Sequence, residues 1–183
     1  MNCKRILILT LTICLTFLAK VSAESDDVVQ RLKETYDLQR HEEGGYFAEV
    51  YTSPFRQRRH RATAGSIYFL LDKEDVSHFH QLDCDEIWCY HAGCGMKITV
   101  LNDGRIEEFF LGVDAENSRA TVVISAGAIF AAENIDKTSY TLVSCVTTPQ
   151  FRYRGFRLIT RDELKKIYPN INDELLRLAY EKV

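Results

Sequence analysis

The chain has 183 residues, of which 46% are hydrophobic and 27% are charged, and its formal net charge is −3. This length is typical of one domain with a substantial hydrophobic core. A mildly acidic chain lacks the basic surface that general nucleic-acid binding requires, so we expect no nucleic-acid partner.

The N-terminal segment has the composition of a secretory signal peptide. Lys4 and Arg5 precede an apolar run over 6–18, and small residues ending at Ala23 follow where a signal peptidase cleaves. The apolar run is too short for a stable transmembrane helix. An uncleaved N-terminal anchor is the alternative.

Cleavage after Ala23 divides the chain into two predicted parts, a signal peptide over 1–23 and a single domain over 24–183. The mature protein is then predicted to be secreted and extracellular, with no membrane contact. Because the signal carries three basic residues and no acidic ones, the formal charge changes from −3 to −6.

Four cysteines remain in the mature chain: Cys84, Cys89, Cys94 and Cys145. An even number in an oxidising compartment favours two disulfides, of unspecified connectivity. Buried thiols are the alternative, and the spacing does not match a structural zinc site.

The mature chain opens with a helical pattern. Asp26 or Asp27 is placed to cap a helix that continues to about Tyr36. The Gly44-Gly45 pair marks a tight turn or a close backbone approach. The aromatic and β-branched run over 46–52 then predicts a strand.

The segment over 54–61 is the most basic part of the mature chain. Arginine guanidinium groups match carboxylates and phosphates, so this segment is a candidate for anion binding. An exposed, solvated loop is the interpretation that we favour.

From Ala64 onward the pattern is of short strands separated by turns. Asn102-Asp103-Gly104 is a strong hairpin signal. Many strands without alternating helices predict an all-β sandwich or barrel. Further strands are expected at 66–71, 96–101, 105–111, 119–125, 128–132, 140–147 and 156–159.

The C-terminus is predicted to be helical. Thr160 and Glu163 form a capping box, and Pro169 ends the helix that follows. Asn172 is placed to cap a second helix.

Candidate ligating residues concentrate in one stretch over 77–93. His78, His80 and Glu86 have even numbers, so in extended strands they point to the same face. Two imidazoles and a carboxylate on one face are a typical ligand set for a metal ion. A metal-free pocket, in which His80 and Glu86 hydrogen-bond a ligand or each other, is the alternative. His91 has the opposite parity and is expected outside.

The same stretch resembles the first motif of the cupin superfamily. His78-x-His80, Glu86 and Gly93 follow the cupin order, with one extra residue between His80 and Glu86. In the second cupin motif, Gly127 and Asn134 match, but Phe130 replaces the histidine ligand.

Four ordered segments are similar to those of an RmlC-like cupin family of unknown function: 41–51, 79–88, 125–130 and 145–151. The likeness extends over about 36–159. It departs at Glu42, where the family has proline, and at Gln81, where the family has arginine. The resemblance implies a cupin double-stranded β-helix, an RmlC-like jelly roll with an N-terminal helix and C-terminal helices.

The resemblance also implies partners and cofactors. A divalent metal (Fe, Mn, Ni or Zn) bound by His78, His80 and Glu86 is one expectation, and no cofactor is the other because Phe130 removes a ligand. Cupins of this kind pair through an N-terminal strand, so a homodimer is expected.

Two classes of function follow. The first is a non-catalytic or storage-like protein that binds a small polar molecule in its barrel. The second is an enzyme such as a sugar epimerase or isomerase, or a metal-dependent cupin enzyme, in which His80 acts as base and a tyrosine, Tyr90 or else Tyr68 or Tyr140, acts as acid. The predicted pocket residues are Glu49, Tyr51, Tyr68, Trp88 and Tyr90.

Overall fold

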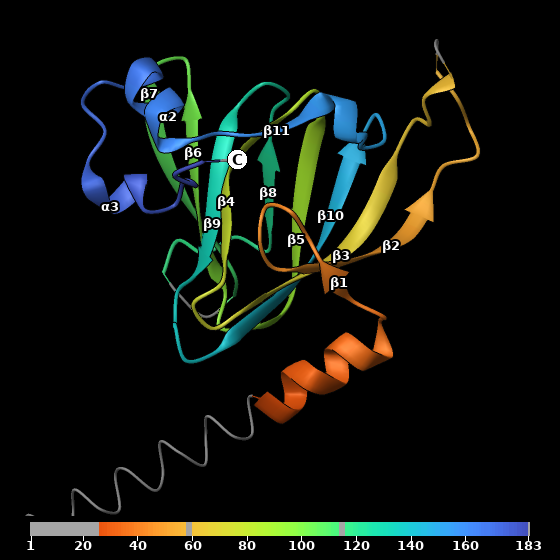
Figure 1. The fold of residues 1–183 in the computed structure, drawn as a ribbon. Coiled ribbons are helices and arrows are strands. Elements are labelled where there is room, and N and C mark those ends of the chain that lie inside the picture. The colour runs from red at the N-terminus through yellow and green to blue at the C-terminus, as the bar shows by residue number, and fades with distance from the viewer. Residues whose placement is uncertain (1–25, 58–59, 114–115, 183) are drawn as a thin grey trace, which may run out of the picture.

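The structure is a computed structural model that describes residues 26–57, 60–113 and 116–182. Two antiparallel sheets pack face to face, with a helix over 26–35 before them and short helices after them (Figure 1). This arrangement confirms the predicted all-β jelly roll. The predicted signal peptide lies outside the described residues.

Each sheet combines strands that are distant in the sequence, as in other jelly rolls. The larger sheet has the order β1 (Gln39–Arg40), β2 (Tyr46–Thr52), β3 (Gly65–Asp72), β10 (Tyr140–Thr148), β5 (Asp85–Gly93) and β8 (Thr121–Ile124). The smaller sheet has the order β11 (Phe156–Leu158), β4 (Val76–Leu82), β9 (Ile129–Asn134), β6 (Met96–Asn102) and β7 (Arg105–Leu111).

Local sequence explains where several elements begin and end. Asp103 and Gly104 both have positive φ, which is the turn geometry that closes the β6–β7 hairpin. Thr160 and Glu163 form the predicted capping box of α2 (Arg161–Ile167). The side chain of Asn172 caps α3 (Asp173–Leu176), a single helical turn that is shorter than the sequence predicted.

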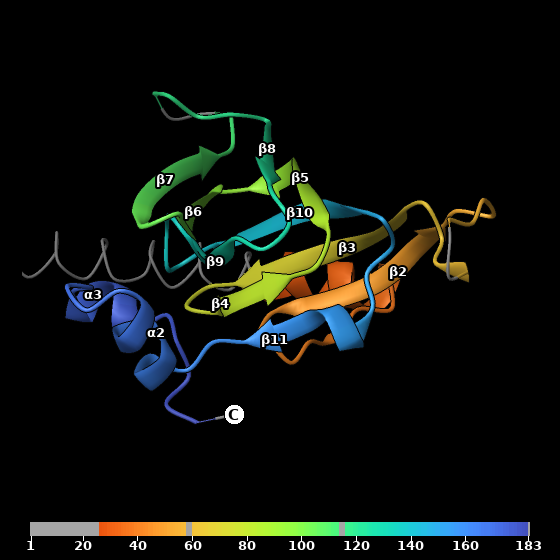
Figure 2. The same cartoon turned by 90° about the horizontal axis from the view of Figure 1, so that it is seen from above.

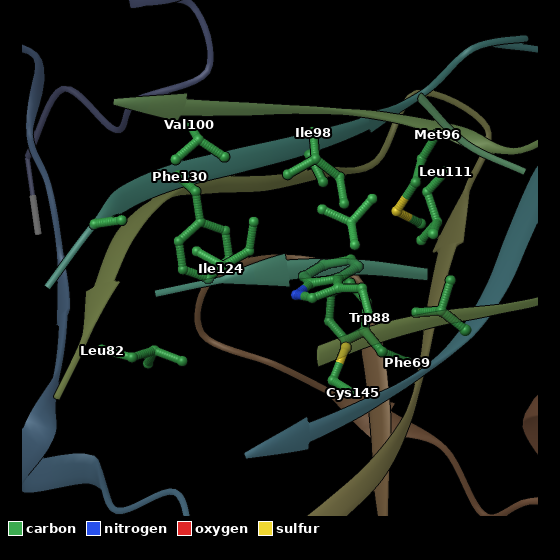
Figure 3. Packing of buried hydrophobic residues seen from close by; sticks show 14 of the residues in the cluster. Phe69, Leu82, Trp88, Met96, Ile98, Val100, Leu111, Ile124, Phe130 and Cys145 are labelled. Carbon is green, nitrogen blue, oxygen red and sulfur yellow. The ribbon is translucent and has the colours of Figure 1, made fainter. Parts of the chain in front are cut away.

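The main hydrophobic core lies between the two sheets. Trp88 is 1% exposed and contacts Phe69 and Phe130, with ring centroids 5.6 and 6.3 Å apart. Figure 3 shows these rings among aliphatic side chains that come from both sheets. The core therefore occupies much of the barrel, and only one end is left for a site.

Two smaller clusters attach the helices to the outside of the barrel. Val29 of the N-terminal helix packs on Leu70 and Leu142 of the larger sheet. Leu164 and Leu175 of the C-terminal helices pack with Phe79 on the smaller sheet. In both Figure 1 and Figure 2, α2 and α3 lie on the opposite side of the molecule from β2. Within the described ranges, no helix is long and apolar enough to cross a membrane.

The predicted disulfides are absent, because the four cysteines of the described residues are free thiols. Cys145 is paired in register with Trp88, so Cys89, one residue further along β5, points to the other face of the sheet. Cys94 lies at the start of the β5–β6 turn, where its sulfur contacts Gly95 and Thr141. These strand positions keep the cysteines apart, although their even number had suggested two disulfides.

We predict that the mature protein is a homodimer that pairs along β2. β1 covers only Tyr46 and Phe47, so the rest of β2 is a sheet edge, and Val50 on that edge is 48% exposed. Light scattering at micromolar concentration should give twice the monomer mass for the wild type. The Val50→Lys variant should give the mass of a single monomer. Val123→Lys, on the exposed face of the other edge strand, is the matched control and should leave the dimer intact. A monomeric wild type contradicts the prediction.

Candidate functional site

The site begins with a tight loop over 41–45 that closes one end of the barrel. The His41 amide donates to the Gly45 carbonyl, and the Gly44 amide donates to the His41 carbonyl. Gly44 has φ of 108°, and a Cβ there would lie 2.0 Å from the Val76 carbonyl oxygen, so only glycine fits. This close approach turns the Glu43 side chain into the barrel, where it is 7% exposed.

A β-bulge in β4 decides which of its side chains face Glu43. The pairing of β4 with β9 shifts register between Ser77 and His80. One extra residue in a strand reverses the alternation of side chains beyond it. As a result Ser77 and His80 both contact Glu43, whereas the ring of His78 stacks on Tyr180 with 3.9 Å between ring centroids.

Glu43 and His80 form a buried acid–imidazole pair. Nδ1 of His80 lies 2.7 Å from the His78 carbonyl oxygen, which only accepts, so Nδ1 carries a proton. Nε2 of His80 then faces Oε2 of Glu43 at 3.3 Å, while Ser77 donates to Oε1 at 2.8 Å. Burial raises the pKa of Glu43 and lowers that of His80. Both shifts favour a neutral pair in which Glu43 holds the proton between them.

His41 completes this group from the loop side. Its Nδ1 accepts the Glu43 amide at 3.3 Å and lies 3.5 Å from Oε2 of Glu43. Burial lowers the pKa of His41, and the attraction of Glu43 offsets part of that change. His41 therefore caps the turn and also lines the cavity.

Glu86 is a second buried carboxyl group at the same place. It is 7% exposed, and its Oε2 accepts a hydrogen bond from the Trp88 indole at 2.8 Å. Burial raises the pKa of Glu86 to about 7, the nearby Glu43 adds to the rise, and His80 and the Trp88 hydrogen bond oppose it. Glu86 is thus a carboxyl group that exchanges its proton near neutral pH.

These groups border a cavity of about 180 Å³ at the open end of the barrel. Its walls come from the loop over 41–45, from β2, β3, β4, β5 and β10, and from the segment that follows β10. The lining contains Glu43, Glu49 and Glu86, and it includes the aromatic side chains of Phe47, Tyr51, Phe69, Phe151 and Tyr153.

The structure places the sequence-predicted pocket residues in two groups. Glu49 and Tyr51 line the cavity, as does Glu86. Tyr68 contacts Tyr36 and His91 on the outer face of the larger sheet, because Ile67 and Phe69 take the inward positions of β3.

Trp88 and Tyr90 keep the predicted parity but serve the core. Trp88 is buried beneath Glu86, and the Tyr90 hydroxyl donates to the Gly93 carbonyl at 2.6 Å. Of the two catalytic candidates, Tyr90 is therefore away from the cavity lining. His80 lies behind Glu43, with 1% of its surface exposed.

The two remaining histidines of the central stretch behave differently from each other. His91 is exposed and hydrogen-bonds Ser144 on the outer face, where the sequence placed it. His78 is not on the face of His80 and Glu86: its Nδ1 contacts the Glu43 carbonyl oxygen at 2.9 Å. The shared-face prediction is wrong for His78 because simple alternation does not include the bulge.

Comparison with known proteins agrees with this geometry. The family described as Cupin superfamily (DUF985) matches residues 30–159. The chain belongs to this cupin family. An uncharacterized protein of Saccharomyces cerevisiae is 27% identical over 177 residues, covering 85% of this chain and 88% of that protein.

Two solved structures are also similar to this cupin. A hypothetical protein from Leishmania major is 31% identical, with a TM-score of 0.76, and the match covers 83% of this chain and 98% of that one. A protein from Shewanella oneidensis is 30% identical, with a TM-score of 0.76, and covers 81% and 94% respectively. These relatives support the fold and family, and their names assign no activity.

The predicted metal ligands of this cupin do not fit a metal ion. His78 is turned away, Nδ1 of His80 is used by a backbone carbonyl, and Nε2 of His80 faces Glu43. Phe130 holds the second-motif ligand position, and its ring centroid is 4.1 Å from that of His80. Among the residues that the structure describes, no group of three or more His, Cys, Asp or Glu side chains is arranged to hold a metal.

Sequence reasoning missed two parts of the site. Glu43 carried a usable signal, since it precedes the glycine pair in the segment that resembles the cupin family. Phe151 carried a similar signal, since it ends the family-like segment over 145–151, whereas Tyr153 lies beyond that segment in a 3-10 turn over Tyr153–Gly155 that the sequence did not indicate. Their approach to the cavity depends on how that segment crosses the barrel end.

Glu86→Gln should stabilise this cupin in a pH-dependent way. Because burial raises the Glu86 pKa from 4.5 to about 7, the wild type is fully stabilised by this group below pH 4.5 and loses that contribution as pH rises through 7. Glutamine does not titrate, so the variant should gain up to about 3 kcal/mol relative to wild type between about pH 5 and pH 8. Urea unfolding at both pH values measures this difference. A pH-independent difference for Glu86→Gln refutes the prediction.

His80→Ala and His91→Ala should differ sharply in stability. Removing His80 leaves Glu43 without its imidazole partner and opens a void beside Phe130, so the free energy of unfolding should fall by roughly 2–4 kcal/mol. His91→Ala should change it by less than about 0.5 kcal/mol, because His91 is exposed. Denaturant unfolding compares the two. Equal effects would mean that His80 is not a packing and hydrogen-bonding centre.

Proposed function

We propose that this cupin is a secreted protein that binds a small polar molecule in its barrel cavity without chemically changing it. The observation that carries this proposal is the burial of Glu43 and Glu86 at the wall of a cavity whose other side chains are mainly uncharged, aromatic and aliphatic groups among them. Buried carboxyl groups cost free energy unless hydrogen-bond donors satisfy them. A few polar groups set in an apolar cavity are typical of small-molecule sites.

Three further features support this proposal. The cavity is open at the barrel end and bordered there by Tyr51 and Tyr153, which are 52% and 55% exposed. The catalytic candidates His80 and Tyr90 do not line it. The secreted location is supported by Lys4, Arg5 and the apolar segment up to Ala23.

A ligand-observed NMR panel tests whether the cavity binds small molecules. The panel contains neutral polyols, small carboxylates and small amines, and we expect at least one class to bind the wild type. Ile67→Trp, at an inward position of β3 that lines the cavity, should abolish that binding, whereas Val123→Trp on the outer face should not. The proposal fails if no class binds, or if both tryptophan variants behave alike.

The second candidate is a small-molecule isomerase or epimerase in which Glu86 carries the proton. The Glu86 pKa of about 7 favours it, because a carboxyl group with that pKa both accepts and donates protons at neutral pH. For a bound molecule with an acidic C–H bond, incorporation of deuterium from heavy water that Glu86→Gln abolishes would favour this enzyme over a binding protein.

A further inference from the structure

The charged side chains of the cavity lining are nearly all acidic. The lining includes three glutamates and one histidine, and no lysine or arginine among the described residues lines it. Glu43 and Glu86 are each 7% exposed, so water screens them little. A ligand that enters therefore meets carboxyl groups and no positive side chain.

Another buried carboxylate of this chain, Glu133, is paired with positive side chains. Glu133 is 4% exposed, and it forms ion pairs with Arg177 at 2.7 Å and with Lys137 at 2.6 Å. Glu43 and Glu86 are buried to a similar degree, but their described partners are a serine hydroxyl, imidazoles and an indole. No lysine or arginine of the described residues forms an ion pair with either group.

Two described arginines near this end of the barrel, Arg61 and Arg152, do not neutralise the charge of these two carboxyl groups. Arg61 makes a bidentate contact with Asp83, at 3.0 and 2.7 Å, and its Nε donates to the Gln150 carbonyl. Arg152 donates to the His60 carbonyl on the same side. Among the described residues, Arg61 and Arg152 thus use their guanidinium groups on Asp83 and on backbone carbonyls, and neither forms an ion pair with Glu43 or Glu86.

Aromatic rings supply a large part of the remaining cavity wall, together with aliphatic and hydroxyl side chains. The rings of Phe151 and Tyr153 are 5.1 Å apart with an interplanar angle of 80°, and Phe47 meets His41 at 86°. Rings set at right angles offer both faces and edges to the space between them. The face of an aromatic ring attracts a cation, and several such rings together recognise alkylammonium groups.

We propose that the ligand of this cavity is an organic cation, a small polar molecule that carries an ammonium or quaternary ammonium group. This inference rests on the proposed binding function and specifies its ligand class. The ammonium group is placed among Phe151, Tyr153 and the carboxylate of Glu86, and it supplies the positive charge that no lysine or arginine of the described residues provides.

Calorimetry with choline, ethanolamine and the tert-butyl analogue of choline tests the proposal. In the analogue a carbon atom replaces the charged nitrogen, so shape is kept and charge is lost. At pH 8 we expect choline or ethanolamine to bind at least about tenfold more tightly than the neutral analogue. Equal affinity for choline and its analogue, or no binding of either ammonium probe, overturns the proposal.

Two variants with matched controls locate the binding. Glu86→Gln should weaken ammonium binding about tenfold, and Glu107→Gln on exposed β7 should not change it. Tyr153→Leu, at a half-exposed position that does not threaten folding, should weaken it severalfold, and Phe55→Leu, 75% exposed, should not. Unchanged affinity in both Glu86→Gln and Tyr153→Leu also overturns the proposal. If polyols or carboxylates bind in the NMR panel while ammonium probes do not, the binding function stands and only the ligand class is wrong.

Discussion

The site depends on one close backbone contact, the approach of Gly44 to the carbonyl of Val76. A side chain at position 44 would collide with that oxygen, so the loop over 41–45 closes against β4 only because the residue is glycine. The contact is reinforced by the His78 amide, which donates to the Glu43 carbonyl at 2.8 Å. With the backbone held in this way, the Glu43 side chain is directed into the barrel, where it meets His80 and Ser77.

The β4 bulge then determines which side chains of β4 contact Glu43. In a regular strand His78 and His80 would point together, as a metal-binding pair requires. The extra residue places Ser77 beside Glu43 and moves His78 to Tyr180, while Phe130 fills the space of a further ligand. The cupin motif residues are thus present in the sequence, but His78 stacks on Tyr180, and His80 and Glu86 contact Glu43 and Trp88.

The distribution of charge links this cluster to function. Glu133, outside the cavity, is neutralised by Arg177 and Lys137, so the fold is able to pair a buried carboxylate with cations. Glu43 and Glu86 are left with neutral donors beside an open, aromatic space. Family membership does not explain this difference, since a cupin barrel supports many functions. The difference lies in the side chains that surround each carboxyl group.

The sequence by itself determined the features that depend on neighbouring residues. Period-two patterns located the strands, Asp103-Gly104 located a hairpin, and Thr160 with Glu163 located a helix start, because each is set within a few residues of chain. The parity of Glu86 and Trp88 was also correct, since β5 is regular there.

Only the tertiary structure decided the composition of the site. The bulge that displaces His78 arises from pairing with β9, more than fifty residues away in the chain. The cavity walls combine Glu43 and Tyr153 with β-strand residues, and their proximity follows from closure of the barrel. The free thiols of Cys89 and Cys145 reflect strand faces in the same way, because cysteine spacing does not specify which face each residue takes.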